Sequence, residues 1–221
     1  MKRALISTVL LAGLSFLAGV AQAQDAKPGN AAEGEKKAAM CIGCHGIKGY
    51  QASFPEIHKV PMISGQGGKY IAAALTAYKK GERKHPTMRA IAVSLTDQDI
   101  ADLSAFYEQH GAGTGQPVPK ALATPMPDAL KDRLQTCLAC HGANFNDTTD
   151  PANPRIAGQY ADYLYVALRS YKVTGNANIG RNNATMGAMV QAFNDKELKQ
   201  IADYLGSLPT ELKVIPQSRF R

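Results

Sequence analysis

Two short stretches hold most of the residue types that could do chemistry in this 221-residue chain. CIGCHG stands at 41–46 and CLACHG at 137–142, and together they contain all four cysteines. Both are CxxCH motifs, in which a helical turn places the two thiols on one side and a histidine follows the second thiol directly. Three kinds of site use such groups: a metal clip, a redox dithiol, or a covalently attached haem.

Haem attachment accounts for every residue of the motif. The two thiols can form thioethers with neighbouring vinyl groups, and the adjacent histidine can bind the iron. Four cysteines could also make a zinc centre, but zinc gives no reason for the histidines. A thioredoxin-like dithiol needs a βαβ setting, which this chain lacks. We therefore expect two covalently bound haem c groups. Their expected attachment residues and iron-binding histidines are Cys41, Cys44 and His45 for one haem, and Cys137, Cys140 and His141 for the other.

The chain repeats itself beyond the motifs. PMISGQ at 61–66 matches PRIAGQ at 154–159, and YIAAALTAYK at 70–79 matches YLYVALRSYK at 163–172. This self-similarity indicates a tandem duplication. The expected domain boundaries are 1–23 for an export signal, 24–110 for the first domain, 111–127 for a Gly/Pro-rich linker and 128–221 for the second domain.

Helical periodicity dominates both halves, so we expect an all-α fold. Residues 69–80 carry apolar side chains at helical spacing. Residues 30–40 are rich in Ala, Glu and Lys, which favour a helix, and lead directly into the first motif. Thr96 with Asp99, and Asn194 with Glu197, are arranged as capping boxes that begin the last helix of each half.

Methionine sulfur is a soft ligand that raises the potential of a haem iron. Met88 and Met186 occupy matched positions in a Thr-Met-x-Ala stretch of each half, so we expect them to be the sixth ligands. Met189 is a rival of Met186, but Ile91 stands opposite it in the repeat. The remaining mature methionines are expected to pack in the interior: Met40, Met62 and Met126. Three histidines outside the motifs could instead give a bis-histidine haem, but none has a histidine partner in the second half: His58, His85 and His110. We expect all three at solvated surface or loop positions, and keep His85 as a rival ligand because it lies three residues before Met88.

The segments that follow each motif predict the surroundings of the haem. The carbonyls of Pro61 and Pro154 are natural acceptors for the second ring N–H of the iron-binding histidines. The glycine just before the final glutamine of each PxxxGQ segment, Gly65 or Gly158, would let the backbone approach the haem face. Four side chains could meet the haem propionates: Tyr70, Tyr163, Arg155 and Lys69. For the two tyrosines, ordinary helix packing is an equally good interpretation.

The N-terminus reads as a secretory signal. Lys2 and Arg3 precede an apolar run, and Ala21-Gln22-Ala23 offers a cleavage site, so we expect cleavage after Ala23 and a periplasmic protein. The run is short for a membrane anchor, the rival interpretation. The formal charge of +7 is spread evenly, which does not favour nucleic acid, and four haem propionates would reduce it further. A basic run at 79–84 suggests either docking on an acidic partner or a solvated face.

Taken together, the signal sequence, two CxxCH domains, PxxxGQ segments, the Thr-Met loops and the DQDIADL helix resemble the dihaem cytochrome c4 family. The resemblance covers 25–210 and implies two class I cytochrome c domains, each with one His/Met haem. It implies an electron carrier rather than an enzyme, with a quinol-oxidising complex or a dehydrogenase as donor and a terminal oxidase as acceptor. Peripheral association with the membrane stays open.

Three alternatives to a free carrier remain: a cytochrome subunit of a dehydrogenase, as in flavocytochromes, a dihaem peroxidase, and a gas sensor. Two features depart from the family pattern. Leu130 stands where the first copy has Gly34, so the terminal helices of the second half must pack differently. The tail after Leu208 has no assigned role.

Overall fold

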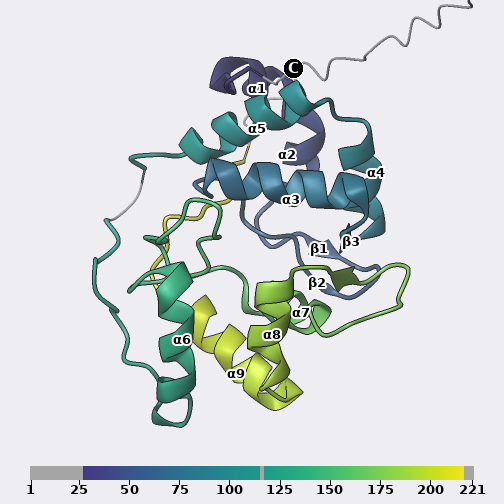
Figure 1. The fold of residues 1–221 in the computed structure, drawn as a ribbon. Coiled ribbons are helices and arrows are strands. Elements are labelled where there is room, and N and C mark those ends of the chain that lie inside the picture. Colours follow the sequence, from purple (N-terminus) through teal and green to yellow (C-terminus); the bar gives the residue numbers. More distant parts are fainter. Residues whose placement is uncertain (1–26, 115–116, 217–221) are drawn as a thin grey trace, which may run out of the picture.

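The computed structural model describes residues 27–114 and 117–216. They form two helical halves that lie one above the other in Figure 1, joined by a long connection at the side. The expected export signal, 1–23, lies outside the described residues. Within the described ranges, no helix is both long enough and apolar enough to cross a membrane.

Within residues 27–114, the first half contains five helices and one small hairpin. The helices are α1 (Ala31–Lys37), α2 (Ala39–His45), α3 (Gly68–Lys80), α4 (Pro86–Val93) and α5 (Asp97–Gln109). The hairpin pairs β1 (Gln51–Ala52) with β2 (His58–Lys59). A core of buried residues, including Ile42, Leu103 and Phe106, lies between these helices.

The second half repeats this order after a short 3₁₀ turn. Its elements are η1 (Asp128–Leu130), α6 (Lys131–His141), α7 (Ala161–Ser170), α8 (Ala184–Gln191) and α9 (Asp195–Gly206). Two further strands, β3 (Arg83–Lys84) and β4 (Gly180–Arg181), pair antiparallel with each other across the two halves. The prediction of an all-α protein with two tandem domains is confirmed, because the strands of the described residues are only two residues long.

The two predicted capping boxes are present at the starts of α5 and α9. The Thr96 side chain accepts from the Asp99 N–H while the Asp99 carboxylate accepts from the Thr96 N–H, and Asn194 and Glu197 form the same reciprocal pair. These boxes satisfy backbone N–H groups that the first helical turn leaves free. They fix the start of the last helix in each half, against which the rest of that half packs.

The two halves differ where their terminal helices meet. At Gly34 of α1, a Cβ atom would lie 2.1 Å from the Asp102 carbonyl oxygen of α5, so only glycine permits this crossing. In the second half Leu130 is 3% exposed and packs in a core with Leu198 and Leu205. The predicted difference in packing is therefore present.

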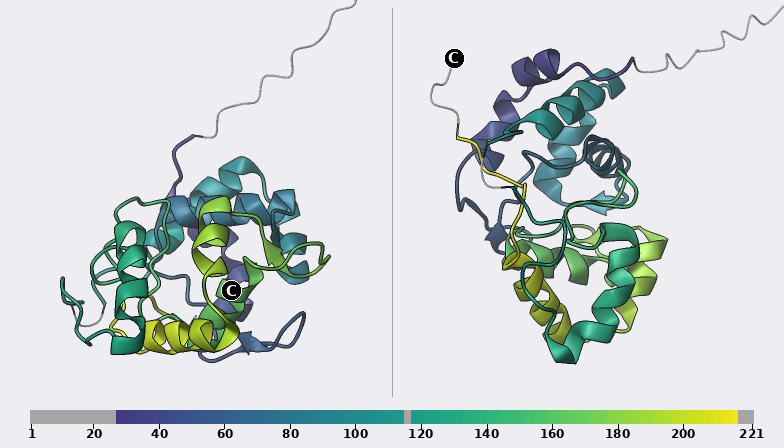
Figure 2. Two further views of the ribbon diagram at one scale, coloured as in Figure 1. Left: turned by 60° about the horizontal axis from the view of Figure 1, so that its bottom comes forward. Right: turned by 90° about the vertical axis from the view of Figure 1, so that its left-hand side faces the viewer.

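The C-terminal segment, residues 209–216, turns back from the second half and runs along the first (Figure 2). The Lys213 N–H donates to the Ser64 carbonyl at 3.0 Å, and the Lys213 ammonium donates to the Gly111 carbonyl at 2.8 Å. Leu212 beside it is 2% exposed. The segment that the sequence left unassigned thus joins the two halves.

Candidate haem-binding sites

Both CxxCH motifs lie at the C-terminal ends of helices. Cys41 and Cys44 belong to α2, and Cys137 and Cys140 belong to α6, so each pair occupies one helical turn as the motif requires. No disulfide joins any of the four cysteines. Burial raises the pKa of Cys41 and of Cys137. Cys41 packs against the first core and Cys137 against the second, so the first cysteine of each pair faces the interior of its half.

The histidine rings after the motifs are held in one orientation. His45 Nδ1 donates to the Pro61 carbonyl oxygen at 2.8 Å, and His141 Nδ1 donates to the Pro154 carbonyl oxygen at 2.9 Å. A carbonyl can only accept, so Nδ1 carries the proton and Nε2 keeps its lone pair. Burial lowers the pKa of both rings, which favours this neutral form. Each ring is thus prepared to bind a metal through Nε2.

Met88 and Met186 occupy equivalent places in two short helices. Met88 is the third residue of α4, and its N–H donates to Nδ1 of the helix cap His85 at 3.4 Å. Met186 is the third residue of α8, and its N–H donates to the side chain of the cap Asn183 at 2.9 Å. Both methionines are partly buried. Their role as sixth ligands stays a prediction that rests on this equivalence.

The other methionines and histidines differ in part from the expectation. Met126 packs against the second core as predicted, but Met40 is 57% exposed and does not pack. Met189 is also an exposed side chain. His58 was expected in solvent and is instead buried, with its ring 5.9 Å from that of Tyr163 in the other half. The sequence could not show this contact because it joins residues of different halves.

A cluster of arginines and tyrosines lies where the halves meet. Arg83 and Arg181 face each other in the β3–β4 pair. The Tyr163 hydroxyl accepts from Arg83 at 2.8 Å and from Arg181 at 3.2 Å, while the Tyr70 hydroxyl accepts from Arg83 at 3.0 Å. The Arg83 guanidinium also stacks on the Tyr78 ring. Two like charges this close repel each other, so an anion placed between or beside them would be stabilised.

The ion pairs of the described residues include neither of these arginines. Burial acts to raise the pKa of Tyr163, but Arg181 and Arg83 outweigh it and lower the pKa to about 7. Arg83 Nε is buried and has no hydrogen-bond partner within the parts of the chain that the structure describes. The cluster is therefore an electropositive site that suits carboxylates such as haem propionates.

The sequence assigned some of these residues differently. Arg83 was placed in a basic surface run, but it lies in the cluster between the halves, and Lys79 bonds the Leu95 carbonyl and pairs with Asp97. A comparison of the repeats could have found the pair, since ERKHPTM at 82–88 aligns with GRNNATM at 180–186. The interpretation of 79–84 as one continuous docking patch is thus wrong for Arg83.

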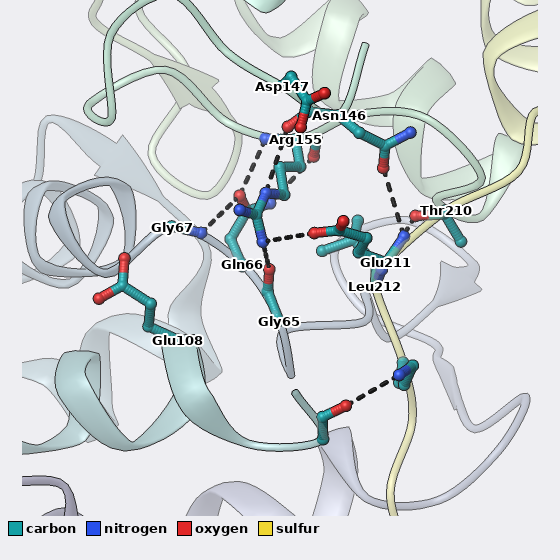
Figure 3. Close-up of polar contacts among 12 residues, drawn as sticks. Gly65, Gln66, Gly67, Glu108, Asn146, Asp147, Arg155, Thr210, Glu211 and Leu212 are labelled. Carbon is teal, nitrogen blue, oxygen red and sulfur yellow. Dashed lines mark hydrogen bonds and ion pairs between the residues drawn. The ribbon is translucent and has the colours of Figure 1, made fainter. Parts of the chain in front are cut away.

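Two other predicted neighbours of the haem have different contacts. Arg155 pairs with Glu211 and donates to the Gly65 carbonyl, so its guanidinium is engaged between the halves (Figure 3). Gly65 has a positive φ of 81°, and a Cβ atom at this position would lie 2.7 Å from the Glu211 carbonyl oxygen. The close approach that requires this glycine is that of the C-terminal segment. Lys69 is exposed on α3.

The residues present fit two haem c groups better than a zinc ion. The paired thiols, the oriented imidazoles and the uncompensated arginines supply attachment points, iron ligands and partners for propionates. By contrast, residues 27–114 and 117–216 contain no group of three or more His, Cys, Asp or Glu side chains that could hold a metal ion.

Comparison with known proteins agrees with this assignment. The family model described as Cytochrome c matches twice, at residues 31–111 and 129–209. Cytochrome c4 of Azotobacter vinelandii is 29% identical over 94% of this chain and 100% of its own length. A thiosulfate dehydrogenase electron acceptor of Stutzerimonas stutzeri is 27% identical over 87% of this chain and 94% of its own length.

A solved structure shares the fold. The crystal structure of reduced recombinant cytochrome c4 from Pseudomonas stutzeri superimposes with a TM-score of 0.58. It covers 82% of this chain and 100% of the other, at 23% identity.

Proposed function

Because the chain belongs to the cytochrome c family, as two tandem domains of the cytochrome c4 type that carry covalent haem c, we propose that it transfers electrons through two His/Met-ligated haems. In this proposal His45 and Met88 bind one iron, and His141 and Met186 bind the other. Each haem, when bound, supplies an iron that alternates between the ferric and ferrous states. The protein itself is an electron carrier and not an enzyme.

The observation that carries the proposal is the repeated pair of histidine–proline hydrogen bonds. Each fixes the tautomer and ring orientation that an iron ligand needs, and both halves build it from the same sequence elements. A catalytic haem would need an open coordination position. The matched methionines on α4 and α8 instead supply a sixth ligand to both sites, which favours electron transfer over peroxide chemistry.

The partners are redox proteins. We assign a quinol-oxidising complex or a dehydrogenase as donor and a terminal oxidase as acceptor, with the protein acting in the periplasm after cleavage behind Ala23. Peripheral association with the membrane would bring it close to such partners. The domain boundaries proposed for this carrier remain 24–110 and 128–221, with 111–127 as the linker.

The ligand assignment is tested with matched methionine variants. Met88→Leu and Met186→Leu should each abolish half of the weak ferric absorption band that reports methionine sulfur on iron, and each should lower the potential of one haem. Met189→Leu and Met40→Leu are controls on exposed methionines and should leave the band unchanged. Loss of the band in Met189→Leu would contradict the assignment of Met186.

A second function is favoured by the similarity to a thiosulfate dehydrogenase electron acceptor. In that case the chain would accept electrons directly from a dehydrogenase and remain bound to it. Purification from native membranes and periplasm distinguishes the two, because a free carrier elutes alone while a dehydrogenase subunit elutes with its enzyme at fixed stoichiometry.

A further inference from the structure

Two buried glutamines cross between the halves of the molecule in a reciprocal way. Gln66 and Gln159 end the two PxxxGQ segments, and their exposed fractions are 4% and 3%. The Gln66 amide contacts the backbone of Arg155, and the Gln159 amide contacts the backbone of Met62. Each glutamine therefore reaches the PxxxGQ segment of the opposite half.

The bonds of the two glutamines are the same. Gln159 Oε1 accepts from the Met62 N–H at 3.0 Å, and Gln159 Nε2 donates to the Met62 carbonyl at 2.9 Å. Gln66 Oε1 accepts from the Arg155 N–H at 2.9 Å, and Gln66 Nε2 donates to the Arg155 carbonyl at 2.9 Å. Figure 3 shows Gln66 between Gly67 and Arg155, with a bond to each backbone N–H.

The peptide groups that these glutamines contact are the ones that hold the iron-binding histidines. The Met62 N–H and the Pro61 carbonyl belong to one peptide unit, and that carbonyl accepts from His45 at 2.8 Å. Likewise the Arg155 N–H and the Pro154 carbonyl form the peptide unit that accepts from His141 at 2.9 Å. A chain of two hydrogen bonds through a single peptide thus leads from each histidine to a glutamine of the other half.

We propose that Gln66 and Gln159 are positioning residues that tune the haem of the opposite domain. Hydrogen bonds in a chain polarise one another, so a glutamine oxygen on the peptide N–H makes its carbonyl a stronger acceptor. A stronger acceptor raises the basicity of the histidine ligand, and a more basic ligand stabilises ferric iron and lowers the potential. Contact between the domains therefore lowers both potentials. The inference rests on the proposed ligation by His45 and His141.

The test uses the full haem-loaded protein with ¹⁵N-labelled histidine. NMR of the ferrous state follows the Nδ1–H resonances of His45 and His141, and a redox titration monitored through these resonances gives a potential for each haem. Gln159→Leu should move the His45 resonance upfield and speed its exchange with solvent. It should also raise the potential of the first haem by about 28 mV. At 59 mV per tenfold, this is a change of about threefold in the ferric-to-ferrous ratio at a fixed potential.

The reciprocal variant supplies the decisive comparison. Gln66→Leu should change His141 and the second haem in the same way, while His45 stays as in the unchanged protein. The exposed Gln109 lies on α5 outside this network, so Gln109→Leu should change neither. Gln159→Met has a side chain of similar length without the amide, so it should raise the first potential as the leucine variant does; it replaces the leucine variant if that variant does not fold.

A response confined to the glutamine's own domain, or an equal response of both haems to each variant, would overturn the inference. Absence of two low-spin haems in the unchanged protein would instead refute the proposed function. The two failures are therefore distinguishable.

Discussion

Gly34→Ala should destabilise the first domain by overpacking the crossing of α1 and α5. The added methyl group would lie 2.1 Å from the Asp102 carbonyl oxygen and 2.7 Å from Cβ of Phe106. Ordinary van der Waals contact begins near 3.4 Å, so the two helices must separate by about 1.3 Å. Forced separation of a packed core costs roughly 1–3 kcal/mol, and occasionally more. We expect about 3 kcal/mol here because the carbonyl belongs to a rigid helix backbone.

Thermal unfolding of the haem-loaded protein measures this cost. A loss of about 3 kcal/mol corresponds to a fall of roughly 6–12 °C in Tm for a chain of this size. The matched control is Gly43→Ala in α2, where an added Cβ meets nothing within 4 Å. It also makes the first motif CIACH, like the CLACH of the second, and should be neutral or stabilising by up to about 1 kcal/mol. Equal Tm values for the two variants would refute the close crossing.

Two further predictions concern charges. Hydrogen bonds from Lys37 and Thr96 lower the pKa of Asp99 to about 2. The ion pair of Asp99 with Lys37 therefore stabilises the fold above pH 3.8, and this stabilisation is lost as the pH falls towards 2. Asp99→Asn should therefore cost about 0.5–1 kcal/mol in urea unfolding at pH 7 and little at pH 2; an equal cost at both would contradict the ion pair. Arg83→Met removes a cation beside the place that we propose for the propionates, so both haem potentials should fall by tens of millivolts in a redox titration, whereas unchanged potentials would place the propionates elsewhere.

The features that the sequence predicted well are local or repeated. The CxxCH motifs, the capping boxes at Thr96 and Asn194, and the helical fold depend on residues close together in the chain, where spacing alone determines geometry. The internal repeat also placed Met88 and Met186 at equivalent positions. Such features need no knowledge of how the two halves meet.

Apart from the exposure of Met40, the features that the sequence missed lie between the halves. Arg83 appeared to belong to a basic surface run because its partner Arg181 is distant in sequence, and only the β3–β4 pairing brings them together. His58 is buried by the second half, and Gly65 makes room for Glu211 of the C-terminal segment. The PxxxGQ repeat was visible, but the crossed contacts of its glutamines follow from the packing of one copy against the other.

The central claim is that both irons are bound by one histidine and one methionine. A spectroelectrochemical titration of protein matured with haem in a bacterial periplasm tests it most directly, with ferric and ferrous spectra recorded throughout. We expect two low-spin haems, both with the ferric band of methionine sulfur and both at positive potentials. A high-spin haem, or a low-potential haem that lacks this band, would contradict it.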